Sequence, residues 1–433
     1  MFFNAGFSYA QSIISDGETE KFLFDLSAPI LEAANLKKEN VTFYIVNDNS
    51  INAFVAMGQN IFVNTGLIRK YKTPDTLIGV ISHEVGHIAG GHLARFNEGS
   101  ESANRAMILS SLLGIAAIAS GSPDAGAAII LGGSQSAQRL FMKYTRTQEE
   151  AADQYAINYL QKISYPVDGL ITLLEFFDHQ TIAYKDQIDE YSLSHPVSKK
   201  RIDLLKNRTS HWNFSNKKTN SSLQKQMNRI LAKLEGFIDN PDFILEKYYA
   251  KNDENSNYIK AIALFRLGRV NESLAFLDPI IRNHQQDGFL FELKAQILAE
   301  TGQLQEAVLN YFYALKLIPA KYAISTKIAF ANTILSIKTN DSQLINMAIK
   351  KLLEAQISDK NNPTIYKNLS NAYNKIKEIG KSYLALGNYY FLTNEKDKAE
   401  KYVKKAQETL EKNDKVSLLI AQDLLNELKD DKK

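Results

Sequence analysis

The clearest chemical motif in the sequence is His83-Glu84-Val85-Gly86-His87. On an α-helix, two histidines four residues apart turn through about 400°, so both imidazoles return to one face and can reach one ion. Zinc suits such a pair, because a catalytic zinc site needs three protein ligands and one open position for water. Glu84 stands beside the first histidine, where it can act as the general base toward that water.

The same five letters also arise by chance on solvated helices. Here the positions in and around the motif include the apolar residues Ile81, Val85, Ile88 and Leu93. This pattern predicts a buried helix. Glycines at 86, 90 and 91 leave room for close packing against another element. Because buried imidazoles need polar partners and a metal ion supplies them, we interpret the pair as metal ligands.

The third ligand must be His, Asp or Glu, because the chain has no cysteine. A metzincin pattern would require a histidine at position 93, which is Leu93. His92 is one residue early and, on a continuous helix, points roughly 140° away from His87. The pattern therefore favours a ligand from another part of the chain.

A later helix offers that ligand. Glu149 and Asp153 lie at positions i and i+4, so they share one helix face. In this scheme Glu149 binds the metal, while Asp153 accepts a hydrogen bond from a ligating imidazole and fixes its tautomer. Glu150, about 100° round the helix, is the alternative ligand.

The elements that position these residues are predicted from periodicity. An opening helix spans about 18–35, and a strand follows at 41–46. Residues 53–55 and 61–63 flank Gly58-Gln59-Asn60 as a hairpin would, which predicts a small antiparallel sheet. Pro74 opens a long helix that carries the histidine motif and runs to about Arg95, and another helix spans roughly 136–162.

Two apolar segments bear on the compartment. Residues 1–10 resemble the end of a secretory signal whose basic start is missing, which predicts a protein of the periplasm or the outside of the cell; the alternative is a frayed N-terminus. Residues 106–130 are apolar but interrupted by glycine and proline, so neither half reaches the ~20 residues that cross a bilayer. We expect a helical hairpin there, with peripheral membrane contact as the alternative.

The C-terminal half repeats with helical spacing. Aligning Gly268 with Gly302 gives a period of 34, the length of a tetratricopeptide unit. One unit places small, aromatic and turn residues as that repeat does: Ala295, Gly302, Ala307, Tyr311, Ala314 and Pro319. A later unit has Gly387, Tyr390, Ala399, Val403 and Ala406, and a longer, irregular unit must lie between them. The pattern predicts a short α-solenoid that can hold peptide.

Length and charge set the remaining limits. The 433 residues favour two main domains, and the near balance of 51 basic and 48 acidic residues gives no field that would attract nucleic acid. We therefore expect an α+β, mostly α protein. Its predicted segments are 1–15 as a signal remnant or disordered N-terminus, 16–212 as a helical catalytic domain, 213–240 as linker and connecting helix, and 241–433 as the repeat region.

The motifs together resemble a known family. HEVGHIAGGHLAR, the later EEAAD, and Ser194-His195-Pro196 followed by Arg201 are similar, in order and spacing, to the HtpX-type gluzincin family of zinc peptidases. The stretch from Asn52 to Gly66 looks like that family's strand beside the active site. The resemblance covers roughly residues 18–210 and implies a zincin-like fold. With the repeats added, the chain resembles the BepA-like periplasmic members, which are associated with assembly and quality control of outer-membrane proteins.

That resemblance implies roles for several residues. Glu149 would be the third ligand of one Zn²⁺ and Asp153 its second-shell partner. His195 would approach the zinc, either as a plug or near the substrate oxyanion, and Arg201 would support the site. The general base would be Glu84.

Substrates would be unfolded or misassembled proteins, lying extended along the hairpin edge. The residues expected to form that edge are Ala53, Phe54, Ile61 and Val63. The outer-membrane assembly machinery is the expected partner of the repeats. The rival hypothesis is a tetratricopeptide scaffold or chaperone whose metal site is latent or structural.

Overall fold

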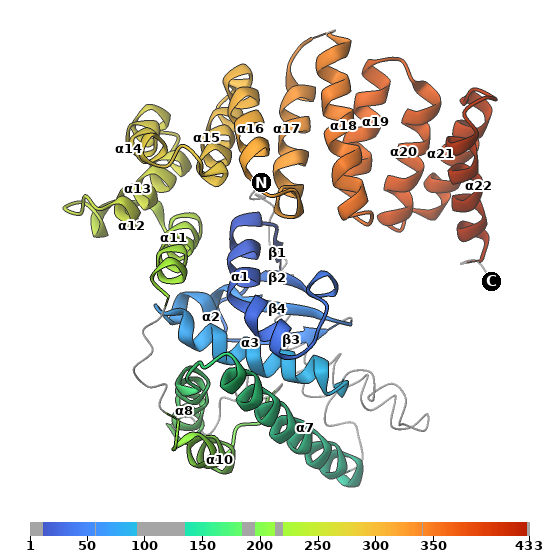
Figure 1. Cartoon of the computed structure of the whole chain (residues 1–433). Coiled ribbons are helices and arrows are strands. Elements are labelled where there is room, and N and C mark those ends of the chain that lie inside the picture. Colours follow the sequence, from blue (N-terminus) through green and yellow to red (C-terminus); the bar gives the residue numbers. More distant parts are fainter. Residues whose placement is uncertain are drawn as a thin grey trace. The chain divides into compact units, whose positions relative to one another are not determined.

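The computed structural model describes residues 12–56, 58–92, 135–183, 195–212, 220–339 and 341–430. Residues 1–11 of the predicted signal remnant, Ser194 and the expected hairpin at 106–130 lie outside these ranges, whereas residues 12–14 of the predicted remnant form a strand. The chain divides into two compact units, residues 1–238 (unit 1) and 239–433 (unit 2), shown in Figure 1. Within the described ranges, no helix is both long and apolar enough to cross a bilayer.

A four-stranded sheet forms one part of unit 1, in the order β1-β2-β4-β3. Its strands are β1 (Ser12–Ile14), β2 (Thr42–Asn47), β3 (Ala53–Ala56) and β4 (Asn60–Asn64). The predicted hairpin is confirmed, since β3 and β4 pair antiparallel with Ala53 opposite Val63.

The sheet is mixed, however, and the expectation of a purely antiparallel sheet was wrong for one pair. β4 runs parallel to β2, because β3 takes the edge and the next strand returns between β3 and β2. Among the described strands, β3 therefore forms the edge of the sheet beside β4, and β4 itself lies in the interior of the sheet.

Helices surround this sheet, with α3 (Pro74–Ala89) packed against α7, α8, α1 and β3. The other helical segments of unit 1 are α1 (Gly17–Ala33), η1 (Lys38–Asn40), α2 (Thr65–Lys70), α7 (Gln135–Lys162), α8 (Asp168–Ala183), α10 (Lys199–Thr209) and α11 (Ser221–Ile238). One apolar core joins these elements, including Ile45, Val63, Val85 and Leu160, each fully buried. Because α3 lies in this core, its polar residues are positioned by rigid surroundings.

The ends of α3 follow the local sequence. Pro74 opens the helix, where its missing N–H costs nothing. The helix ends at Ala89, so the prediction that it runs to about Arg95 was too long. Gly91 adopts a φ of 61°, a left-handed conformation that glycine allows without steric cost, and the chain turns away there.

Close packing brings α3 to α7. A Cβ at Gly86 would stand 2.7 Å from the carbonyl oxygen of Ala152 on α7. Only glycine permits this approach, which brings the histidine motif beside the helix that carries Glu149.

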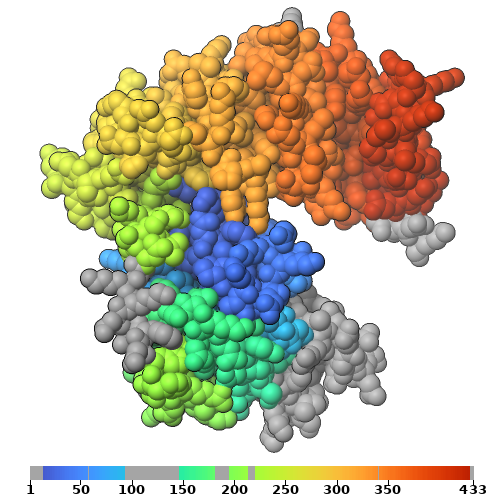
Figure 2. Space-filling view, viewed as in Figure 1, coloured from blue at the N-terminus to red at the C-terminus, as the bar shows by residue number. Residues whose placement is uncertain are grey.

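Unit 2 consists of helices, and Figure 2 shows them following one another in sequence order along its surface. They are α12 (Pro241–Lys247), α13 (Glu254–Arg266), α14 (Val270–Asn283), α15 (Gly288–Glu300), α16 (Leu304–Leu317), η2 (Ala320–Tyr322), α17 (Ile324–Ser336), α18 (Ser342–Ser358), α19 (Pro363–Lys375), α20 (Ile379–Leu392), α21 (Lys396–Thr409) and α22 (Lys415–Asp430). Neighbouring helices pack on one another, as the predicted helix-turn-helix repeat requires.

The turns between these helices explain the repeat. Gly268 and Gly302 have φ of 73° and 85°, so each ends its helix in the left-handed conformation. Lys377 and Asn394 take the same conformation in later turns, at 64° and 59°, although neither is glycine. The expected irregular unit corresponds to α17 and α18, of which α18 has 17 residues against 14 in α16.

Candidate metal centre

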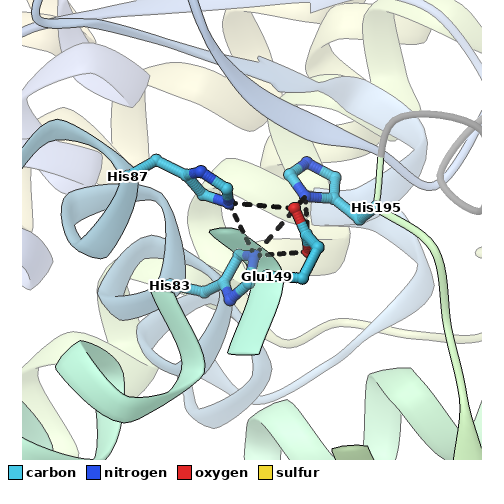
Figure 3. Close-up of side chains that lie close together, drawn as sticks. All are labelled: His83, His87, Glu149 and His195. Carbon is cyan, nitrogen blue, oxygen red and sulfur yellow. Dashed lines mark hydrogen bonds and ion pairs between the residues drawn. The ribbon is translucent and has the colours of Figure 1, made fainter. Parts of the chain in front are cut away.

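Three separate segments of unit 1 converge on one point, drawn in Figure 3. Helix α3 supplies His83 and His87, helix α7 supplies Glu149, and the segment before α10 supplies His195. One donor atom from each of these four residues lies within 4.8 Å of the others. The grouping brings together residues from distant parts of the sequence.

The distances within this group are those of donors facing a common centre. Nε2 of His83 lies 3.1 Å from Nε2 of His87, and each lies 3.2 Å from one oxygen of Glu149. Nδ1 of His195 is also 3.2 Å from Glu149 Oε2. Imidazole nitrogens and a carboxylate are the ligands that zinc and similar divalent metals prefer, so this donor set fits such an ion.

Glu84 lies beside the group, fully buried on α3. The backbone N–H of Val55 on β3 and the imidazole of His195 are polar neighbours of its carboxylate. Burial raises the pKa of Glu84, because the charged carboxylate has lost its water. Nε2 of His195 is 3.4 Å from Glu84 Oε1. A buried carboxyl of this kind is suited to accepting and returning a proton.

Asp153 and Arg201 support the donors from behind. Nδ1 of His83 lies 2.9 Å from Asp153 Oδ1, which leaves Nε2 of His83 facing the centre. Arg201 donates to both oxygens of Asp153, at 2.7 and 2.8 Å, and its Nη1 is 3.0 Å from Glu149 Oε2. The guanidinium also donates to the carbonyl of Pro196, which ties the His-Pro segment to the site.

Burial and neighbouring charges shift the pKa values of the side chains in this group. Although burial favours neutral imidazole, the carboxylates of Glu149 and Asp153 raise the pKa of His83 to about 10. Burial, together with the nearby His83 and His195, lowers the pKa of His87 to about 4 despite the charge of Glu149. Burial opposes ionisation of Asp153, but Arg201 and His83 hold its pKa at about 2. The pKa of Glu149 is likewise held well below its ordinary value, against the effect of burial, by His195, Arg201 and His87.

Some predicted residues lie elsewhere. Glu150, the alternative ligand, is on the surface of α7 and pairs with Lys200 at 2.7 Å. Ile61 and Val63 lie on β4, which is paired on both sides, so their backbone cannot form a free edge and their assignment to the edge strand is corrected. On β3, the carbonyl of Ala53 is 3.3 Å from Nε2 of His195, so the edge strand borders the centre.

Phe54, the other β3 residue named from the sequence, has a different setting. Its ring stacks on Phe62 with centroids 5.0 Å apart. Successive side chains of a strand point to opposite faces, so the side chains of Phe54 and Ala53 lie on opposite faces of the sheet. Phe54 therefore contributes its backbone to the edge.

His92 is not among the four donors, as the sequence argument concluded, but it contacts one of them. Its Nδ1 lies 3.0 Å from Nδ1 of His87, on the side of that ring away from the centre. The exclusion assumed a continuous helix, whereas α3 ends at Ala89. The pair Gly90-Gly91 before His92 was the available sequence indication of that break.

Comparison with known proteins finds a family model that resembles this region. Residues 21–209 match the model described as peptidase family M48. That range contains all the residues of the centre described above.

Curated relatives match over a longer stretch. The chain is 24% identical over 300 residues to the "Beta-barrel assembly-enhancing protease" of Escherichia coli O157:H7 and 25% identical over 300 residues to that of Yersinia pestis. Each alignment covers 68% of this chain and 61% of the relative, so this chain spans about three fifths of their length. A "Putative beta-barrel assembly-enhancing protease" of Vibrio cholerae serotype O1 is 29% identical over 198 residues, which cover 44% of this chain and 39% of the relative.

A solved structure also aligns. The crystal structure of the P58(IPK) TPR domain covers 81% of this chain and 98% of its own, at 15% identity and a TM-score of 0.18. A likeness at that score supports no argument about the fold.

Proposed function

We propose that this chain, whose residues 21–209 match peptidase family M48, is a zinc-dependent endopeptidase that cleaves unfolded or misassembled proteins. One observation carries the proposal. The donor atoms of His83, His87 and Glu149 converge at distances near 3 Å, with the fully buried carboxylate of Glu84 beside them. A structural metal site would not require that buried carboxylate.

In the proposed mechanism His83, His87 and Glu149 hold the metal. A bound zinc ion would polarise the scissile carbonyl and lower the pKa of water toward ~7. Glu84 accepts the proton of the attacking water and delivers it to the leaving amine, for which its raised pKa suits it. Asp153 and Arg201 keep His83 and Glu149 in place.

The substrate lies extended beside β3 in this proposal. Among the described strands, only β4 pairs with β3, and the Ala53 carbonyl of β3 borders the centre. Backbone pairing to such an edge accepts many sequences, as a peptidase of unfolded chains must. Ala53 and Phe54 therefore supply the substrate-binding edge, and Ile61 and Val63 support it from β4.

His195 restrains the site in our proposal. Counted as a ligand, it makes a set of four protein donors, whereas a catalytic zinc site keeps one position open. The same side chain contacts the Ala53 carbonyl that a substrate strand would use. His195 must therefore move before peptide can bind.

The decisive experiment pairs Glu84→Gln with Glu150→Gln. Purified protein is incubated with an unfolded protein, with and without a chelator, and metal content is measured in parallel. We expect chelator-sensitive fragments from the wild type and from Glu150→Gln, whose residue is exposed on the same helix as Glu149. Glu84→Gln should keep its metal but lose activity by about 10²- to 10⁴-fold.

Two results would count against the peptidase. Wild-type turnover by Glu84→Gln would remove the proposed base. Absence of cleavage by the wild type on several unfolded proteins would favour the rival function, a scaffold or chaperone built on unit 2.

The biological setting is proposed from the named relatives. Since they are called beta-barrel assembly-enhancing proteases, we propose periplasmic action on outer-membrane proteins, with unit 2 contacting the assembly machinery. Site-specific crosslinking from unit 2 in envelope preparations tests this, and crosslinks confined to cytoplasmic proteins would contradict it.

A further inference from the structure

His92 occupies an unusual place next to the metal centre. Its Nδ1 lies 3.0 Å from Nδ1 of His87, and the ring centroids are 5.0 Å apart at an interplanar angle of 79°. His92 is 7% exposed, so this contact is shielded from water. At this distance the two Nδ1 atoms form a hydrogen bond between the rings.

The chain is shaped to bring His92 there. Gly91 turns the backbone in the left-handed conformation directly after α3. A Cβ at Gly90 would stand 2.4 Å from Nε2 of His92, so only glycine leaves space for the ring. The carbonyl oxygen of His92 also lies 3.5 Å from Nε2 of Gln148, the neighbour of Glu149 on α7. Gly90 and Gly91 together therefore allow the imidazole of His92 to lie beside His87.

We infer that His92 is a positioning residue that orients His87 for metal binding. A histidine that binds metal through Nε2 carries its proton on Nδ1, and it needs an acceptor for that proton. His92 Nδ1 is the acceptor that the structure provides, so His87 presents its unprotonated Nε2 to the centre. This inference rests on the proposed metal site.

The two histidines of the motif are thereby held by different groups. His83 has the carboxylate of Asp153 behind it, while His87 has the imidazole of His92. A carboxylate can only accept, whereas an imidazole accepts at one nitrogen in only one of its two neutral tautomers. His92 must therefore carry its own proton on Nε2, and substitutions can test that requirement.

The experiment compares His92→Asn, His92→Gln and His92→Leu. The amide oxygen of asparagine can take the place of Nδ1, whereas the longer glutamine places its amide nearer the position of Nε2. We expect His92→Asn to bind Zn²⁺ within a fewfold of the wild type. His92→Gln and His92→Leu should lose about 10- to 100-fold in affinity, the usual effect of removing such a partner.

Affinity is measured by competition with a chromophoric chelator, independently of proteolysis. Cobalt-substituted protein gives a second readout, because its visible absorption should change in the glutamine and leucine variants and not in asparagine. Thermal unfolding of the metal-free variants separates lost folding from lost orientation.

Equal affinity in all four proteins, with unchanged cobalt spectra, would overturn the role of His92. A loss in the asparagine variant as large as in leucine would also overturn it, since acceptance at Nδ1 would then not be the property that matters. If the wild type binds neither metal, the proposed peptidase site fails as well, whereas tight metal binding without cleavage would leave the role of His92 standing.

Discussion

The two units bury their polar groups in different ways. In unit 1 most of the buried charged side chains gather at one centre, where His83, Glu84, Glu149 and Arg201 are each at most 3% exposed. In unit 2 the buried polar groups are dispersed, and several satisfy a neighbouring carbonyl, as Ser273 does with Ala261. Concentrated burial of charge costs stability unless every partner is present, so its occurrence in unit 1 indicates chemistry, whereas unit 2 indicates packing.

The largest effect should come from breaking the charge network of unit 1. Arg201→Met leaves the carboxylates of Asp153 and Glu149 buried without the guanidinium that contacts both. We expect a loss of about 3–5 kcal/mol in the free energy of unfolding, measured with urea on metal-free protein. Arg269→Ala is the control in unit 2, where the pair with Glu272 is exposed to solvent and should contribute little to stability. Similar losses in both variants would remove the distinction between the units.

A smaller effect is expected from releasing the proposed restraint. His195→Ala removes contacts to Glu149 and Ala53 that must break before substrate binds. A hydrogen bond to a charged group contributes about 1.5–3 kcal/mol, so basal proteolysis should rise by roughly 10- to 100-fold. Hydrolysis of an unfolded protein measures it, with His284→Ala as the exposed control in unit 2. Lost activity would instead assign His195 a part in catalysis.

Turn substitutions test how unit 2 is held. Gly302 has a φ of 85° and open space around a Cβ, so Gly302→Ala costs backbone strain alone, about 1 kcal/mol. Lys377 adopts a φ of 64° with a side chain, so Lys377→Gly should raise stability by up to about 1 kcal/mol. Thermal unfolding reads both, and metal affinity should stay unchanged. The two variants should shift the unfolding temperature in opposite directions, and shifts in the same direction would contradict the role given to these turns.

The smallest effect should appear on acidification. Burial opposes ionisation of Asp16, but the ammonium of Lys233 on α11 holds the pKa of Asp16 below its ordinary 3.8. A carboxyl with a depressed pKa stabilises the fold above its unfolded value and loses that contribution as pH falls through the folded pKa. Unfolding of wild type should therefore become easier below about pH 4. In Asp16→Asn that part of the pH dependence should be absent, and an identical acid profile would refute it.

Short-range pattern was enough for much of the protein. The spacing of His83 and His87 on one helix, and of Glu149 and Asp153 on another, depends only on helical geometry, which is local. The repeat was visible for the same reason, since Gly268 and Gly302 end equivalent helices. Even the mixed sheet contains the hairpin that its strand pattern predicted.

Tertiary structure alone decided how these local pieces meet. The parallel pairing of β2 with β4 and the bridge from Arg201 to Glu149 join residues far apart in sequence, whose contacts no periodicity specifies. His92 shows the limit most clearly, because one left-handed glycine redirected a side chain that helical geometry had pointed away. Residue types and spacing determined which groups could bind a metal; packing across the core determined which of them face one another, because long-range contacts form only when the whole unit folds.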